Sequence, residues 1–243
     1  MDALVKVDTR KVFKGNAIVA ASNKMTLIES RLLLLAIAKL DIKKPIPSPL
    51  EITVSDYAET FDLPVNDCYA HVKKATALLF DREIVATVDT NGFDKIRWLS
   101  RASYIPRSGM SHLYFSAEVA PFLVDLKNNF TRYELKKVAG LNSIHSMRLF
   151  ELLMRFRETG YYTVSIEDFR ELMGLSEGYS RFNNLNLRIL KPCIKELEDK
   201  SGIAIQLETT RTGRVVSHLS FYFTLSNKIP LPLGDESGAS ETA

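Results

Sequence analysis

The sequence is poor in the residues that catalysis and metal binding most often use. Its 243 residues include two cysteines and four histidines, none at the spacing of a zinc site or of an HExxH motif. A GxxxxGK[ST] loop for nucleotide phosphates is also absent. We therefore expect no enzyme, no metal and no cofactor. Cys68 and Cys193 are expected to be buried free thiols, and Tyr161-Tyr162 to begin a strand rather than to act as nucleophiles.

Long apolar runs are missing as well. Residues 32–38 form the most apolar stretch, which is much too short to span a bilayer, and the polar N-terminus lacks the apolar region of a signal peptide. We expect a cytoplasmic protein with no membrane partner. The net charge of +3 is too small to imply a nucleic-acid partner by itself, so the positions of the charges matter more than their sum.

One sequence pattern occurs twice. Residues 52–63 align without gaps with residues 164–175, with apolar residues in common and with Asp56 matching Asp168 and Glu59 matching Glu171. In both copies a short β-like segment leads to a polar capping residue and then to a short amphipathic helix. The pattern indicates an internal duplication of one structural unit.

The flanks of the two copies also correspond. An apolar helix is predicted before each copy, at residues 26–40 and 143–157. A second helix is predicted after each, with one apolar face made by Tyr69, Val72, Leu78 and Leu79 in the first and by Phe182, Leu185, Ile189 and Leu190 in the second. A hairpin follows: strands 83–88 and 95–104 flank Asn91-Gly92, and strands 203–208 and 215–225 flank residues 209–214.

This order of helix, helix, turn, helix and hairpin is that of a winged helix. The sequence predicts an α+β chain of two tandem, related winged-helix domains. We expect a flexible N-terminal arm at 1–14, a first domain at 15–128, a second at 129–227 and a disordered tail at 228–243. The segment 114–141 is not rich in Gly or Ser, so we expect it to be packed rather than to act as a free tether.

Acidic residues are absent from the two elements of the second copy that would contact DNA. No Asp or Glu lies between Tyr179 and Lys195, or between Thr209 and Lys228. Arg can bind guanine through two hydrogen bonds and Asn can bind adenine in the same way. The candidate DNA-binding residues here are Tyr179, Ser180, Arg181, Asn183, Asn184, Arg188 and Lys191 on the helix, and Arg211 and Arg214 at the hairpin tip. The alternative is a solvated basic face, and Pro192 is expected to kink this helix.

The first copy has a weaker basic pattern, because Asp67 and Asp81 flank its helix. Its candidate contacts to DNA phosphates are His71, Lys73, Lys74 and Arg97. The strand that contains Trp98 and Arg101 has an alternative use as an edge that pairs with a second subunit. A plain core position for Trp98 is a third interpretation.

Several segments resemble a known family. They are residues 96–102 followed by Ser108-Gly109, residues 129–133, residues 146–153, and residues 178–182 followed by Arg188, Leu190, Ile194 and Glu196-Leu197. Their order and spacing resemble those of the RepE/Pi-like plasmid replication initiators, which bind iterons through two winged-helix domains.

The resemblance implies double-stranded DNA as the partner, with the second domain on direct repeats at a plasmid origin. It implies that monomers initiate replication together with host replication proteins. It also implies that dimers, joined through the first domain at Trp98 and Arg101, bind an operator and repress the protein's own gene. Two alternatives stay open: a winged-helix transcription regulator without a replication role, and a protein-interaction module, whose DNA affinity would lack a steep salt dependence.

Overall fold

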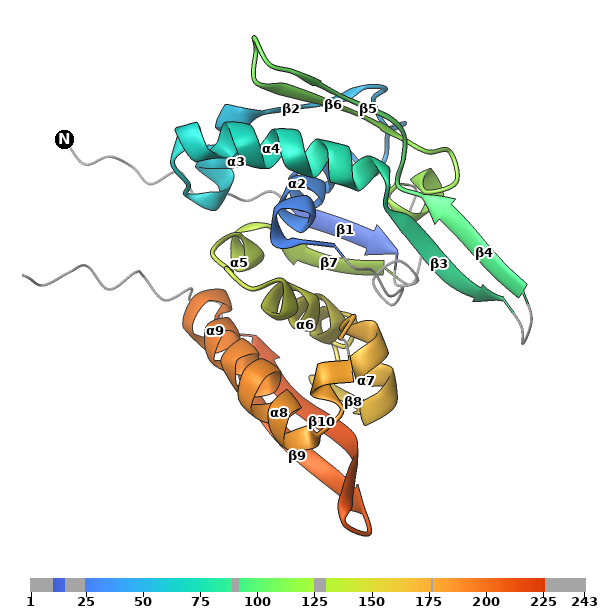
Figure 1. The fold of residues 1–243 in the computed structure, drawn as a ribbon, viewed down its shortest axis with the longest axis vertical. Helices are drawn as coiled ribbons and strands as arrows, with labels where there is room; N and C mark the ends of the chain where they lie inside the picture. Colours follow the sequence, from blue (N-terminus) through green and yellow to red (C-terminus); the bar gives the residue numbers. More distant parts are fainter. Residues whose placement is uncertain (1–10, 16–24, 89–91, 125–129, 176, 226–243) are drawn as a thin grey trace, which may run out of the picture.

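Two copies of one arrangement of helices and strands lie one above the other in the computed structural model (Figure 1). The structure describes residues 11–15, 25–88, 92–124, 130–175 and 177–225. The expected tail and most of the expected N-terminal arm lie outside these residues. The mixture of helices and sheets confirms the α+β class.

The first copy begins with helix α2 (Leu27–Ala38), strand β2 (Leu50–Thr53), helix α3 (Val54–Phe61) and helix α4 (Val65–Phe80). The amide of Thr26 donates to Glu29 (2.8 Å) and the amide of Asp56 donates to Thr53 Oγ1 (3.0 Å), so each of the first two helices starts at a polar cap. Helix α2 is buried along most of its length, and it packs against α4 and α3.

The second copy has the same order. Helix α6 (Ile144–Met154) precedes strand β8 (Tyr161–Ser165) and helix α7 (Ile166–Leu172), and a second long helical segment follows. The amide of Asp168 donates to Ser165 Oγ (3.0 Å), as Asp56 does to Thr53. The turns that end α3 and α7 correspond as well, because Asp62 and Gly174 both have positive φ (50° and 63°). The duplication seen in the sequence is therefore confirmed.

Strands of the first copy depart from the prediction at Trp98. The hairpin of β3 (Glu83–Val88) and β4 (Gly92–Arg97) is confirmed, but the predicted strand 95–104 is interrupted at Trp98, which is buried. Strand β5 (Leu99–Ile105) then joins β6 (Met110–Phe115) in a separate sheet of order β2-β6-β5. Packing of the indole into the core redirects the chain from one sheet to the other.

The hairpin of the second copy is longer than predicted. Strands β9 (Ile203–Thr212) and β10 (Val215–Leu225) pair up to Thr212 and Val215, so residues 209–212 are strand and not turn. Together with β8 they form a sheet of order β8-β10-β9, and the hairpin projects beyond the rest of the domain (Figure 1).

A two-stranded sheet joins the N-terminal end of the described chain to its middle. Strand β1 (Lys11–Gly15) pairs antiparallel with β7 (Phe130–Glu134), so residues 11–14 are not a flexible arm. This sheet contacts α2 through β1 and α6 through β7. The predicted boundary at 128/129 falls next to residues outside the described ranges and stays a prediction.

The described residues between the two copies, 114–124 and 130–141, are packed, as expected. The segment includes the short helices η1 (Ala120–Phe122) and α5 (Lys136–Ala139). Its apolar residues Val119, Leu123, Leu135, Val138 and Leu141 are buried. None of the described helices is long and apolar enough to cross a membrane.

A buried ion pair fastens β1 to α6. Lys14 Nζ lies 2.6 Å from Glu151 Oε1, and the Tyr133 hydroxyl on β7 donates to the same carboxylate oxygen. Burial raises the pKa of Glu151, but the Lys14 ammonium and the Tyr133 hydroxyl outweigh it and hold this pKa below its usual value. The Lys14–Glu151 pair therefore links β1 to α6 in a buried place, where water does not solvate either charge if its partner is removed.

We expect Lys14→Met to lower the free energy of unfolding by about 3–5 kcal/mol, because it removes the ammonium that lies 2.6 Å from the buried Glu151 carboxylate. Urea unfolding at pH 7 measures this change. The matched control is Lys44→Met, which breaks an exposed pair with Asp41 and should leave the unfolding midpoint unchanged. Equal, small effects of both substitutions would contradict the account.

Candidate nucleic-acid interface

The recognition segment of the second copy is one helix in three parts. Helix α8 (Phe182–Leu185) continues into η3 (Asn186–Leu190), a π-helical turn, and then into α9 (Lys191–Ser201), which ends at Gly202 with φ 63°. Its apolar residues Leu185, Ile189, Leu190, Cys193 and Leu197 are buried. The sequence predicts a kink at Pro192. The structure instead has a π turn just before it, at Asn186–Leu190.

Most of the predicted helix residues lie on the solvent side of this segment. Ser180, Arg181, Asn183, Arg188 and Lys191 are exposed, whereas Tyr179 and Asn184 are half-buried. No acidic side chain pairs with Arg181, Arg188 or Lys191 within the described part of the chain. The segment therefore presents unpaired cations and amides to solvent.

Arg170, on α7, supports the start of this segment, and the sequence analysis missed it. Its Nε donates to the carbonyl of Tyr179 (3.1 Å), and its guanidinium also donates to the carbonyl of Ser180. These bonds hold the short helix η2 (Glu177–Tyr179) and the residue before Arg181 against α7. In the sequence, Arg170 looks like any exposed arginine of a short amphipathic helix, so its bonds to these carbonyls could not be predicted.

The tip of the β9–β10 hairpin is basic as predicted. Arg211 lies near the end of β9, and Arg214 follows Gly213, whose φ of 62° makes the tight turn possible. Both arginines are exposed, and neither has an acidic partner among the described residues. The recognition segment and the hairpin lie in the same domain (Figure 1), and each carries arginines without an acidic partner among the described residues.

Charges of the first copy are arranged differently. Lys73 and Lys74 are exposed on α4, but His71 is half-buried with its Nδ1 enclosed and without a partner. Arg97 lies 4.0 Å from Glu83 and 5.8 Å from the centroid of the Phe80 ring, so its charge is partly neutralised. The structure therefore leaves the two lysines as the clearest free cations of α4.

Trp98 cannot be an exposed dimer contact in this structure. Its side chain is 1% exposed, and its backbone amide and carbonyl bond to Arg82 and Ser116. The core interpretation is the correct one for this residue. Arg101, in contrast, is exposed on β5, an edge strand, and its guanidinium lies 5.0 Å from the centroid of the Tyr114 ring.

Residues considered for catalysis are placed as the sequence predicts. Cys68 and Cys193 are buried free thiols, and burial raises the pKa of Cys193 to about 11. Tyr161 and Tyr162 begin β8. Within the described ranges, no group of three or more His, Cys, Asp or Glu side chains could hold a metal ion.

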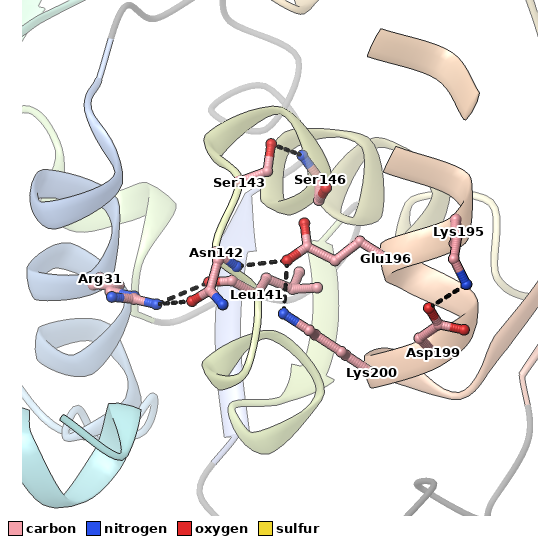
Figure 2. Close-up of polar contacts among 9 residues, drawn as sticks. All are labelled: Arg31, Leu141, Asn142, Ser143, Ser146, Lys195, Glu196, Asp199 and Lys200. Atoms are coloured by element: carbon pink, nitrogen blue, oxygen red, sulfur yellow. Dashed lines mark hydrogen bonds and ion pairs between the residues drawn. The ribbon is translucent and has the colours of Figure 1, made fainter. Parts of the chain in front are cut away.

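A chain of hydrogen bonds links the first copy to the recognition segment (Figure 2). Arg31 of α2 donates to the carbonyl of Leu141 (2.9 Å) and to Asn142 Oδ1 (3.0 Å). The amide of Asn142 donates to Glu196 Oε1 on α9 (2.7 Å), and Lys200 lies 3.1 Å from the same oxygen. Burial raises the pKa of Glu196, but its hydrogen bonds, those from the Ser146 side chain, the Asn142 amide and Lys200, hold the pKa below its usual value.

We expect Glu196→Gln to lower the free energy of unfolding at pH 7, because the charged carboxylate accepts the Asn142 and Lys200 bonds more strongly than an amide does. The difference should be full above the ordinary carboxyl pKa of 4.5 and shrink as the pH falls through the lower folded value. Urea unfolding from pH 3 to 7 tests this, with exposed Glu118→Gln as the control. A pH-independent difference would contradict it.

Comparison with known proteins agrees with this architecture, which places the chain in the class of proteins with two winged-helix domains. The family model for the first winged-helix domain of initiator replication proteins matches residues 11–154, and the model for their second winged-helix domain matches residues 165–223. The chain belongs to the initiator replication protein family.

Individual relatives are consistent with that assignment. A replication initiation protein of Escherichia coli is 28% identical over 230 residues, which cover 90% of this chain and 71% of the relative. A probable replication protein of Bifidobacterium longum is 31% identical over 109 residues, 44% of this chain and 35% of that protein. The crystal structure of the Pi initiator protein in complex with iteron DNA has the same fold, with a TM-score of 0.76 and 19% identity over 91% of this chain and 100% of that one.

Proposed function

We propose that this protein initiates plasmid replication by binding direct repeats (iterons) at the origin, and that it acts without catalysis. The observation that carries the proposal is the pair of basic elements in the second domain, residues 181–191 of the recognition segment and the hairpin tip, whose arginines have no acidic partner among the described residues. The family supplies the replication role, and the Pi protein, which has the same fold, is bound to iteron DNA in its crystal structure.

In this proposal α8 enters the major groove. Arg181, Asn184 and Arg188 face base edges, where Arg recognises guanine and Asn recognises adenine. Arg211 and Arg214 on the wing hold phosphates or enter the minor groove. Tyr179, Ser180, Asn183 and Lys191 contact the same stretch of DNA.

The first domain contributes backbone contacts through Lys73 and Lys74, with weaker contributions from His71 and Arg97. Several copies of the protein bind adjacent repeats and bend the origin DNA. Host replication proteins are then recruited by contact with the protein, in the cytoplasm. The DNA is thus prepared by binding energy and not by a chemical step.

Equilibrium binding to a duplex of direct repeats from upstream of the gene, against a shuffled duplex at about 0.15 M salt, tests the proposal. We expect a preference on the order of a thousandfold, with stoichiometry that follows the number of repeats. Specific binding to a lone palindrome would favour a transcription regulator. Weak and equal binding to both duplexes would favour a protein-interaction module.

We expect Arg188→Ala to weaken binding to the repeat by about 1–3 kcal/mol and to relax the preference at one base pair, because Arg188 is assigned to a guanine. Lys74→Ala is the matched control. It should weaken binding to all duplexes alike and reduce the salt slope by about one. Competition titrations against single-base variants measure both. Equal weakening of specific and random duplexes by Arg188→Ala would reassign that residue to phosphate.

The second part of the proposal is autorepression by a dimer on an operator. Strand β5 supports it, because it lies at the edge of its sheet and has main-chain groups available for pairing. Arg101 is exposed on this strand, whereas Trp98, which precedes it, is buried. In this arrangement two first domains pair through β5, and monomers in equilibrium with the dimer bind the origin.

Arg101→Glu should weaken self-association and leave repeat binding by the monomer intact, because it places an acid at the proposed pairing edge and removes the cation over Tyr114. Sedimentation equilibrium over a range of protein concentrations measures the change. Arg107→Glu, an equal change of charge at an exposed position beyond β5, serves as the control. If both variants associate like the wild type, β5 is not the dimer edge.

A further inference from the structure

The recognition segments of the two domains differ in one geometric feature. Helix α4 of the first domain is α-helical from Val65 to Phe80, whereas the segment of the second domain contains the π turn η3. Within this turn the amide of Lys191 donates to the carbonyl of Asn186, five residues earlier. Such turns are rare in proteins and are found mostly as single insertions at functional sites.

Pro192 is one cause of this turn. Proline has no amide hydrogen, and in a regular helix its ring meets the carbonyl four residues earlier, which here is that of Arg188. A wider turn immediately before the proline moves that carbonyl aside. The first domain has no proline inside α4, where Pro64 precedes the helix as its N-cap.

The spacing of the buried residues is the second cause. Leu185, Ile189, Cys193, Leu197 and Ser201 follow one another at intervals of four, and all five are buried. In a regular α-helix such a series rotates by about 40° at each step, or about 160° from first to last. One extra residue in a turn removes about 100° of that rotation. The π turn therefore keeps the whole series against the core.

The same turn redistributes the polar residues. In a regular α-helix Arg181, Asn184, Arg188, Lys191 and Lys195 would share a stripe about 80° wide. With the extra residue, the positions after Leu190 are rotated by about 100° relative to those before it. The side chains of Asn184 and Arg188 thus point to one side of the helix, and those of Lys191 and Lys195 point to a different side.

The far end of the segment cannot rotate to compensate. Glu196 of α9 accepts the amide of Asn142 (2.7 Å), and Lys200 braces the same carboxylate (Figure 2). Buried Cys193 and Leu197 lie on the same helix, which packs against α6 and α5. With α9 held in place, the geometry of η3 decides where the side chains of α8 point.

We propose that the π turn η3 is the specificity determinant of the second domain: it directs Asn184 and Arg188 to bases and turns Lys191 toward the phosphate backbone. The proposal rests on the proposed function, because it assumes sequence-specific binding by this domain. It makes Pro192 and the extra residue of η3 positioning elements, which contact no base themselves.

Deletion of Leu187 tests the proposal. The deletion makes Arg188 follow Asn184 by three residues instead of four. Arg188 is thereby turned by about 100° relative to Asn184, while the buried residues on either side of the turn stay against the core. We expect a folded protein whose preference for the repeat over a shuffled duplex falls about tenfold or more. Its affinity for the shuffled duplex and the salt slope should stay as in the wild type. Leu187→Ala is the matched control, because it removes the same 53% exposed side chain and keeps the chain length.

Each outcome has one meaning. Loss of preference in the deletion variant with retention in Leu187→Ala supports the proposal. Retention in the folded deletion variant, or an equal loss in Leu187→Ala, overturns it. A wild-type protein that shows no preference for repeats instead defeats the proposed function itself.

Lys191→Ala gives a second test that does not depend on folding of the deletion variant. We expect it to weaken binding to all duplexes alike and to lower the salt slope by about one, with the base preference kept. If Lys191→Ala relaxes the base preference as Arg188→Ala should, both residues face bases and the proposed division by η3 is overturned.

Discussion

The arrangement of the two domains depends on the hydrogen bonds that converge on Leu141, Asn142 and Ser143. Main-chain groups that leave water need partners, and this short segment finds them on both sides (Figure 2). Arg31 of the first domain donates to the Leu141 carbonyl, and the Asn142 amide donates to Glu196 of the second domain. The Ser143 hydroxyl accepts the Ser146 amide at the start of α6 (3.3 Å). The orientation of α9 is thereby tied to α2.

The two related domains differ in the shape and charge of their recognition helices. In the first domain α4 is a regular helix, and nearby Arg97 is partly neutralised by Glu83. In the second, the helix is held at its far end by Glu196, and its solvent side carries Arg188, which has no acidic partner in the described part of the chain. In our proposal one fold thus serves two purposes: the first domain associates with a second copy, and the second domain reads DNA.

The sequence was sufficient to predict what depends on local pattern. The duplication, a polar cap before each short helix, the hairpins and the basic face from Arg181 to Lys191 all follow from spacing and residue type, and the structure places the caps at Thr53 and Ser165. Pro192 correctly indicated an irregular helix. The π turn itself was not predicted; the series at intervals of four from Leu185 agrees with it, because such a series turns by about 160° around a regular helix.

Features that depend on distant residues were not predictable in this way. Lys14 and Glu151 are 137 residues apart, and nothing in their local sequence indicates that they pair. Without that pair, residues 11–14 resemble an exposed basic arm rather than a strand. Arg31 and Arg170 likewise serve main-chain carbonyls far from their own helices, and Trp98 interrupts a predicted strand because the core accepts its indole.

The central claim is that the second domain reads bases from the major groove. Methylation interference on a repeat duplex tests it most directly, because methylation of guanine N7 blocks the group that Arg181 or Arg188 of the recognition segment would bind. We predict that N7 methylation of one or two guanines in each repeat abolishes binding. Binding that tolerates N7 methylation at every guanine of the repeat would contradict the account.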